Sequence, residues 1–161
     1  MRASLTGGYA PRGVAYTAHP MGNGGFNNPL EPASACADPA LLRAFATDAS
    51  GASGQVPAQL LYPRSREDVQ AIVREAIRTR TPLVPVSSGP PHFHGDTVPA
   101  RGGVVVDFSR MNRVLRIDRP SRSVRVEPGV TYGALIPQLR AQGLRLSLPL
   151  LPRANKSVVA S

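Results

Sequence analysis

The residues with the clearest potential for chemistry are small and hydroxyl-bearing, and they follow a short apolar run. Ser87, Ser88 and Gly89 come directly after residues 83–86. Small residues let a ligand approach the backbone closely, and successive N–H groups can converge on an anion such as a phosphate. The pattern therefore predicts an anion-binding loop, although a tight strand exit without a ligand would use the same residue types.

Two short strands are predicted to frame this loop. Residues 83–86 contain two valines, and residues 104–107 begin with three valines in a row. Short apolar runs bounded by Gly and Pro are typical of strands that are covered on both faces. Because α/β sheets bind ligands at the carboxyl ends of their strands, the loop lies where a binding site is expected.

A strand and a helix are predicted before the loop. Residues 60–62 indicate a strand that ends at Pro63, and Ser65 indicates a helix N-cap, with Asp68 completing a capping box. With the strand at 83–86, this arrangement is a βαβ unit with an expected right-handed crossover. One helix face carries apolar residues at helical spacing. They are Val69, Ile72, Val73, Ala76 and Ile77.

The second half of the chain predicts an antiparallel hairpin. Its strands are expected at residues 113–118 and 123–127, around a turn at Pro120. The register that follows gives one apolar face. It sets Ile117 opposite Val124, and Leu115 opposite Val126.

A further helix is predicted after the hairpin. Thr131 is the expected N-cap and Gly143 the expected residue just past the C-terminus. Pro137 lies inside this helix, where it should remove one backbone hydrogen bond or bend the axis. Residues 144–151 are apolar and broken by proline, and residues 152–157 form a polar loop.

The charge of the chain is strongly positive. Its 161 residues hold 19 Lys and Arg against 10 Asp and Glu, a net charge of +9, and Lys156 is the only lysine. An arginine excess fits a solvated basic surface or an acidic partner. The few aromatic residues do not interleave with the arginines as they do in proteins that bind single-stranded nucleic acid, so the solvated surface is favoured.

The cellular compartment of the protein is predicted from its cysteine count and from the lengths of its apolar segments. Cys36 is the single cysteine, which excludes an internal disulfide and favours a reducing compartment. The first thirty residues show no apolar segment of the signal-peptide kind, and no apolar span has membrane length. These features predict a soluble, cytoplasmic protein. His92 and His94 have no third ligand nearby in the sequence, so no metal site is predicted.

The folded domain is predicted to cover residues 38–161. Residues 1–37 lack periodicity and contain Gly, Asn and Pro clusters, which favours a disordered or loosely attached segment. Asp38 is then the expected N-cap of a short helix, with Pro39 at its first position.

Four strings, taken in order, resemble the FAD-binding domain of the p-cresol methylhydroxylase and vanillyl-alcohol oxidase type. They occupy residues 63–69, 84–85, 103–112 and 126–130. The glycolate oxidase and D-lactate dehydrogenase-like flavoproteins are the nearest branch. The resemblance covers roughly residues 38–161 and implies an α+β fold, in which FAD lies between a small parallel βαβ subdomain and an antiparallel subdomain. Only the start of the second subdomain is expected here.

The resemblance also implies which residues bind FAD. Its pyrophosphate loop corresponds to residues 86–95, and a segment after the last predicted helix should face the flavin. The implied cofactor residues are Val86, Ser87, Ser88, Gly89, Pro90, Pro91, His92, Gly95, Pro152 and Ser157.

This loop departs from the family pattern. Serines replace two glycines, and Pro90 and Pro91 remove two N–H donors, so a phosphate would rely on Ser87, Ser88 and Gly89. Some relatives attach flavin covalently through a loop histidine. His92 is a candidate for that role, although the prolines displace its position and a plain surface role is favoured.

The reaction implied by the resemblance is hydride transfer from the α-carbon of a 2-hydroxy acid to flavin. The family's cap domain and most of its catalytic residues would lie beyond Ser161, so no catalytic residue is assigned and a truncated gene product is expected. That truncation should expose Leu144, Leu146, Leu148, Leu150 and Leu151. Two alternatives stay open, namely a non-catalytic subunit that completes an FAD site with a partner chain, and a basic nucleic-acid-binding module.

Overall fold

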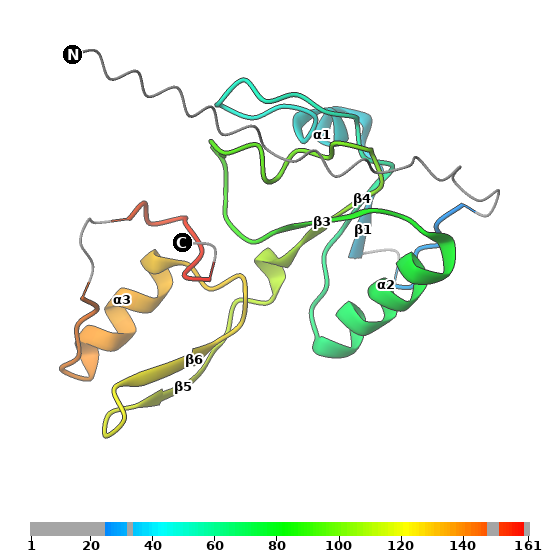
Figure 1. The fold of residues 1–161 in the computed structure, drawn as a ribbon. Coiled ribbons are helices and arrows are strands. Elements are labelled where there is room, and N and C mark those ends of the chain that lie inside the picture. Colours follow the sequence, from blue (N-terminus) through cyan, green and yellow to red (C-terminus); the bar gives the residue numbers. More distant parts are fainter. Residues whose placement is uncertain (1–24, 32–33, 148–151, 160–161) are drawn as a thin grey trace, which may run out of the picture.

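Three parallel strands and one antiparallel edge strand form the sheet that carries the candidate loop. The structure is a computed structural model and describes residues 25–31, 34–147 and 152–159. The strand order is β1-β2-β4-β3, and only β1 runs antiparallel to its neighbour (Figure 1). The bounds are β1 Ala35–Cys36, β2 Gln59–Leu61, β3 Leu83–Val86 and β4 Val104–Asp107.

Helix α2, Arg66–Thr79, connects β2 to β3, and β4 lies between these two strands. The predicted capping box is confirmed: the Asp68 amide donates to Ser65 Oγ at 3.1 Å, and the Ser65 amide donates to Asp68 Oδ2 at 3.2 Å. The helix packs on one sheet face, where Ile72 joins Leu61, Val104 and Val106. The predicted βαβ unit is therefore present, and β4 lies between its two strands in the sheet.

The apolar face predicted for α2 is too wide. Ile72 and Ala76 are 1% and 5% exposed, but Val73 and Ile77 are 41% and 72% exposed. Thr79 is buried instead, and its hydroxyl donates to the Glu75 carbonyl at 2.8 Å. A helix that rests on a sheet buries one narrow stripe, so apolar residues beside the stripe stay in solvent.

Ile72→Ala should lower the free energy of unfolding by about 2–5 kcal/mol, because it removes a fully buried side chain and leaves a cavity. Ile77→Ala changes the same residue type on the same helix, but at an exposed position, and should have little effect. Urea unfolding of both variants measures the difference. Equal losses of stability would contradict this placement of α2.

Helix α1, Pro39–Ala44, covers the other sheet face, where Leu42 contacts a cluster that includes Leu60 and Val105 (Figure 1). Its predicted N-cap is confirmed, since the Ala40 amide donates to Asp38 Oδ1 at 2.9 Å. Neighbouring strand residues point to opposite faces, so the two helices bury alternate side chains of β2 and β4.

The sheet begins earlier than the predicted boundary at Asp38. Most of the segment predicted to be disordered, residues 1–24 and 32–33, lies outside the described residues. The described part contacts the domain, because Ala35–Cys36 pairs with β2 and the Asn27 amide donates to Glu75 Oε1 at 3.1 Å. A strand of two residues has no periodicity, so sequence patterns miss it.

Strands β5, Val114–Asp118, and β6, Ser123–Val126, form the predicted hairpin. The pairing of Ile117 with Val124 is confirmed, but the pairing of Leu115 with Val126 is wrong. Val114 lies opposite Val126, because a register shift places Leu115 outside the ladder, where it is 51% exposed. A β-bulge of this kind leaves one residue unpaired and bends the strand.

An ion pair closes the open end of the hairpin. Arg113 Nη2 lies 2.6 Å from Glu127 Oε1, and the Arg113 amide donates to Glu127 Oε2 at 2.8 Å. The hydrogen bonds from the Arg113 side chain hold the pKa of the buried Glu127 carboxyl below its ordinary value. The carboxylate is therefore charged at neutral pH and fixes the start of β5.

Helix α3, Tyr132–Ala141, packs on the hairpin (Figure 1). Thr131 is its N-cap, Pro137 lies inside it and Gly143 follows it with φ +69°, as predicted. The core between them contains Val130, Leu135 and Leu139.

The residues after α3 differ in part from the prediction. Leu144 and Leu146, which were expected to be exposed, are half-buried against the α3 core. They pack there because the chain turns back at Gly143, which brings the two leucines over α3 and the hairpin. Leu148, Leu150 and Leu151 lie outside the described residues.

Candidate cofactor site

The candidate loop leaves β3 at its carboxyl end and is anchored to the chain after α1. Val86 is 3% exposed and ends the strand in the core. Further along, the Gly95 amide donates to Asp48 Oδ2 at 2.6 Å, and the Ala49 amide donates to the His92 carbonyl at 2.9 Å. Hydrogen bonds from the Ser50 hydroxyl and from backbone amides, including that of Gly95, lower the pKa of Asp48. Asp48 therefore acts as a charged anchor for the loop.

The segment after α3 contacts the other side of the loop. Four hydrogen bonds join residues 88–91 to residues 153–157. The Ser157 amide donates to Ser88 Oγ at 2.9 Å, the Gly89 amide to the Asn155 carbonyl at 3.2 Å, Asn155 Nδ2 to the Pro90 carbonyl at 2.9 Å, and Arg153 Nη2 to the Pro91 carbonyl at 2.8 Å.

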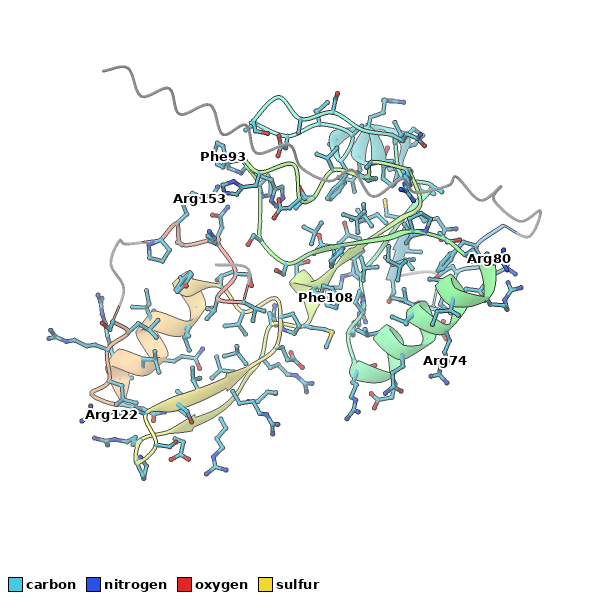
Figure 2. The ribbon with its side chains drawn as sticks, viewed as in Figure 1. Arg74, Arg80, Phe93, Phe108, Arg122 and Arg153 are labelled. Carbon is cyan, nitrogen blue, oxygen red and sulfur yellow. The ribbon has the colours of Figure 1, made fainter. Side chains whose placement is uncertain are left out.

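Arg153 also makes a ring contact at this junction. Its guanidinium carbon lies 5.4 Å from the centroid of the Phe93 ring, within the range of a cation–π interaction (Figure 2). Arg153 is thus oriented both by the Pro91 carbonyl and by Phe93.

A pocket of about 210 Å³ lies between the two segments. Four of the ten predicted cofactor residues line it, namely Val86, Ser87, Ser88 and His92. Pro85, Phe93, His94, Asp96, Thr97, Arg153 and Lys156 complete the lining.

The other predicted residues do not line this pocket. Gly89, Pro90 and Pro91 hydrogen-bond to residues 153–157, and Gly95 is bound to Asp48. Ser157 is fully buried, and its hydroxyl donates to the Pro128 carbonyl at 2.7 Å. Pro152 is half-buried and lies outside the lining. Gly89, Pro90, Pro91 and Ser157 join the two segments, and the contact of all six residues with a cofactor stays a prediction.

Arg153 and Lys156 are the two basic pocket residues that the sequence prediction omits. They stand one and four positions after Pro152, and Lys156 is the only lysine of the chain. Basic residues in the polar loop after a predicted helix, beside a predicted anion site, were a signal that could have identified them.

The pocket suits an anion that carries more than one charge. The amide N–H groups of Ser88, His92, Phe93 and His94 have no hydrogen-bond partner among the described residues. Arg153 and Lys156 line the same pocket, and Asp96 is its only acidic residue. Free amides and cations around one space are the donor set that binds phosphate groups, so the residues present fit the pyrophosphate of FAD.

Two further findings concern the part of the chain that the structure describes. No group of three or more His, Cys, Asp or Glu side chains gathers there in a way that would hold a metal ion. None of the helices in those residues is long and apolar enough to cross a membrane.

Comparisons with known proteins identify the family of the chain. A family model described as an FAD binding domain matches residues 57–159. The 1'-carboxy-chondrochloren decarboxylase of Chondromyces crocatus is 35% identical over 76% of this chain, and D-2-hydroxyglutarate dehydrogenase of Stutzerimonas stutzeri is 35% identical over 66%. This chain spans 23% of the length of either relative.

The fold is also similar to that of a solved flavoprotein structure. The 4-ethylphenol oxidase from Gulosibacter chungangensis, in its isoeugenol complex, superposes with a TM-score of 0.65 and 31% identity. The match covers 80% of this chain and 25% of that one. The fold class is thus α+β, as predicted. The chain belongs to the FAD-binding domain family of the p-cresol methylhydroxylase type, and its cofactor is FAD.

Proposed function

We propose that this chain holds the FAD pyrophosphate in a flavin-dependent enzyme that oxidises a 2-hydroxy acid. The observation that carries the proposal is the pocket in which Ser87 and Ser88 meet Arg153 and Lys156. Two relatives bear names of the same substrate class, D-2-hydroxyglutarate dehydrogenase and glycolate oxidase subunit GlcD of Bacillus subtilis. When bound, FAD supplies the acceptor for the hydride of the substrate α-carbon.

The residues of the chain would bind and orient the cofactor. Arg153 and Lys156 offset phosphate charge, and the amides from His92 to His94 donate hydrogen bonds to the phosphate oxygens. Ser87 supplies a hydroxyl on the β3 side of the pocket. Because Asp48 anchors one side of the loop and residues 153–157 the other, little reorganisation is needed when FAD binds. No described residue is given a catalytic role.

The size of the pocket also supports the alternative of a subunit that shares its FAD site. Its volume of about 210 Å³ is smaller than the roughly 300–1,000 Å³ that drug-sized ligands occupy, and FAD is larger than most of those. Further protein surface must complete the site, and a partner chain is one source of it.

Replacement of the basic residues Arg153 and Lys156 by neutral residues tests whether the pocket binds the FAD pyrophosphate. The double variant Arg153→Gln, Lys156→Gln should weaken FAD binding at least about tenfold, because two charge-assisted contacts to phosphate are lost. Quenching of FAD fluorescence on titration with the chain measures the affinity. The matched control Arg43→Gln, Arg66→Gln removes the same charge from exposed helix positions and should bind FAD as the parent chain does.

Three results would distinguish the pyrophosphate assignment, the shared FAD site and the proposed substrate class. Equal affinity in the parent chain and the pocket variant would contradict the pyrophosphate assignment. FAD binding that requires a co-purified second chain would support the shared site. The substrate class is tested separately, because flavin in the complete enzyme should be bleached anaerobically by D-2-hydroxyglutarate, D-lactate or glycolate, and failure of all three would reject it.

A further inference from the structure

A large aromatic side chain lies beside the candidate phosphate site, and the proposed function gives it no role. Phe93 lines the cofactor pocket between His92 and His94. It is 48% exposed, whereas the other three phenylalanines of the chain are half-buried against the apolar clusters. Isolated exposed apolar residues are common on protein surfaces, but this one lines a space with the donor set of an anion site. Part of its ring is therefore open to a ligand in the pocket.

The contacts of Phe93 orient its ring without burying it. The Arg153 guanidinium carbon lies 5.4 Å from the ring centroid, and Arg153 Nη2 also donates to the Pro91 carbonyl at 2.8 Å (Figure 2). None of the three apolar clusters of described residues contains Phe93. A ring that is fixed in this way offers a surface on which a planar base can stack, because bases and aromatic side chains both present π faces.

The same pocket holds a carboxylate that a phosphate site does not need. Asp96 is the only acidic residue of the lining, and its carboxylate forms no hydrogen bond or ion pair with a described residue. A carboxylate repels phosphate oxygens, but it accepts hydrogen bonds from hydroxyl and amino groups. Its presence is explained if the ligand carries such groups next to its phosphates, as a nucleotide does in its ribose.

Phe93 and Asp96 are placed to contact one nucleotide. They are three positions apart and line the same pocket, in the loop whose amides from His92 to His94 have no hydrogen-bond partner among the described residues. A single ribose separates the 5′-phosphate of a nucleotide from its base. A phosphate bound by these amides would therefore bring the ribose hydroxyls and the base of the same nucleotide to this loop.

We propose that Phe93 and Asp96 form an adenosine subsite, in which adenine stacks on Phe93 and the Asp96 carboxylate accepts hydrogen bonds from ribose hydroxyls. The inference rests on the proposed function, because it takes this pocket to hold the pyrophosphate. The isoalloxazine ring suits the subsite less well. It gains negative charge when it is reduced, so a neighbouring carboxylate would oppose the reduction, whereas adenine stays neutral.

Phe93→Trp reports the stacking directly, because the chain contains no tryptophan of its own. This variant keeps an aromatic surface, and its tryptophan fluorescence should be quenched when ADP is added to the full chain. Inorganic pyrophosphate, which has no base, should bind without quenching the fluorescence. Leu115→Trp is the control, because Leu115 is 51% exposed on the hairpin and does not line the pocket. Its fluorescence should not respond to ADP.

Binding constants from titration calorimetry give the size of each contribution. Phe93→Ala should weaken ADP binding at least about fivefold and leave the affinities for pyrophosphate and FMN within about twofold of the parent. Phe93→Tyr keeps the ring and should retain the affinity for ADP. Asp96→Ala should reduce the preference for ADP over pyrophosphate at least about fivefold, because it removes both an acceptor for the ribose and a charge that repels phosphate.

The outcomes separate this inference from the proposed function. If pyrophosphate does not bind, or binds equally well to the Arg153→Gln, Lys156→Gln variant, both are overturned. If pyrophosphate binds through Arg153 and Lys156 but Phe93→Ala binds ADP as the parent does, only the adenosine subsite is overturned. Equal losses of ADP and FMN affinity in Phe93→Ala would assign the ring to the flavin and would overturn it too. Retained pyrophosphate binding shows that a variant is folded.

Discussion

Ser88→Asp is expected to weaken FAD binding at least about a hundredfold, which corresponds to about 2.7 kcal/mol. Ser88 lines the pocket, and its hydroxyl accepts a hydrogen bond from the Ser157 amide at 2.9 Å. An aspartate can still accept that hydrogen bond, so the contact between the two segments is retained. The new carboxylate would face the phosphate charges in a partly desolvated site, where repulsion is poorly screened.

The measurement is the dissociation constant for FAD, by fluorescence titration. Ser121→Asp is the matched control, because Ser121 lies in the exposed hairpin turn and the change of side chain is the same. If Ser88→Asp binds FAD as tightly as Ser121→Asp does, the loop after β3 is not the pyrophosphate site. A higher salt concentration should reduce the difference in FAD affinity between the two variants, because the repulsion is electrostatic and salt screens it.

Gly103→Ala should destabilise the domain by about 3 kcal/mol or more, through backbone strain and steric overlap together. Gly103 has φ +89°, a conformation that L side chains rarely adopt. A Cβ at this position would lie 2.3 Å from the Pro82 carbonyl oxygen. That same carbonyl accepts the hydrogen bond of the Val104 amide at 2.9 Å, so it cannot move away without loss of the start of β4.

Gly25→Ala is the control for this second variant. A Cβ on Gly25 would have no atom within 4 Å, so its unfolding free energy should match that of the parent chain. Thermal or urea unfolding followed by circular dichroism gives both values. A loss below about 1 kcal/mol for Gly103→Ala would mean that the backbone before β4 relaxes easily.

Local signals in the sequence predicted most of the secondary structure correctly. Ser65 with Asp68, and Thr131 with Gly143, define the ends of α2 and α3, because capping depends on side chains within a few residues of the helix end. The valine runs identified β3 and β4, because strand propensity also depends on residues that are close in the sequence. The family resemblance then placed these elements in an FAD-binding domain.

Features that depend on distant contacts were missed. The register shift at Leu115 has no signal in the residues around it, and the two-residue strand β1 is defined only by its pairing with β2. The burial of Thr79 in place of Ile77 depends on which side of α2 faces the sheet, and the apolar pattern of the helix alone does not decide this. In the candidate site, the basic character of Arg153 and Lys156 was a signal in the sequence, but their contact with the loop after β3 is made across more than sixty residues.

The hydrogen bonds between the loop after β3 and the segment after α3 also bear on the order of folding. The four bonds join residues that are 62, 65, 66 and 69 positions apart, and the hairpin and α3 lie between them in the chain. Contacts this distant in sequence carry a large loop-closure entropy and form late. The cofactor pocket should therefore assemble after the sheet, the hairpin and α3 have folded. A chain in the course of synthesis would therefore complete this pocket only after residue 157 had left the ribosome.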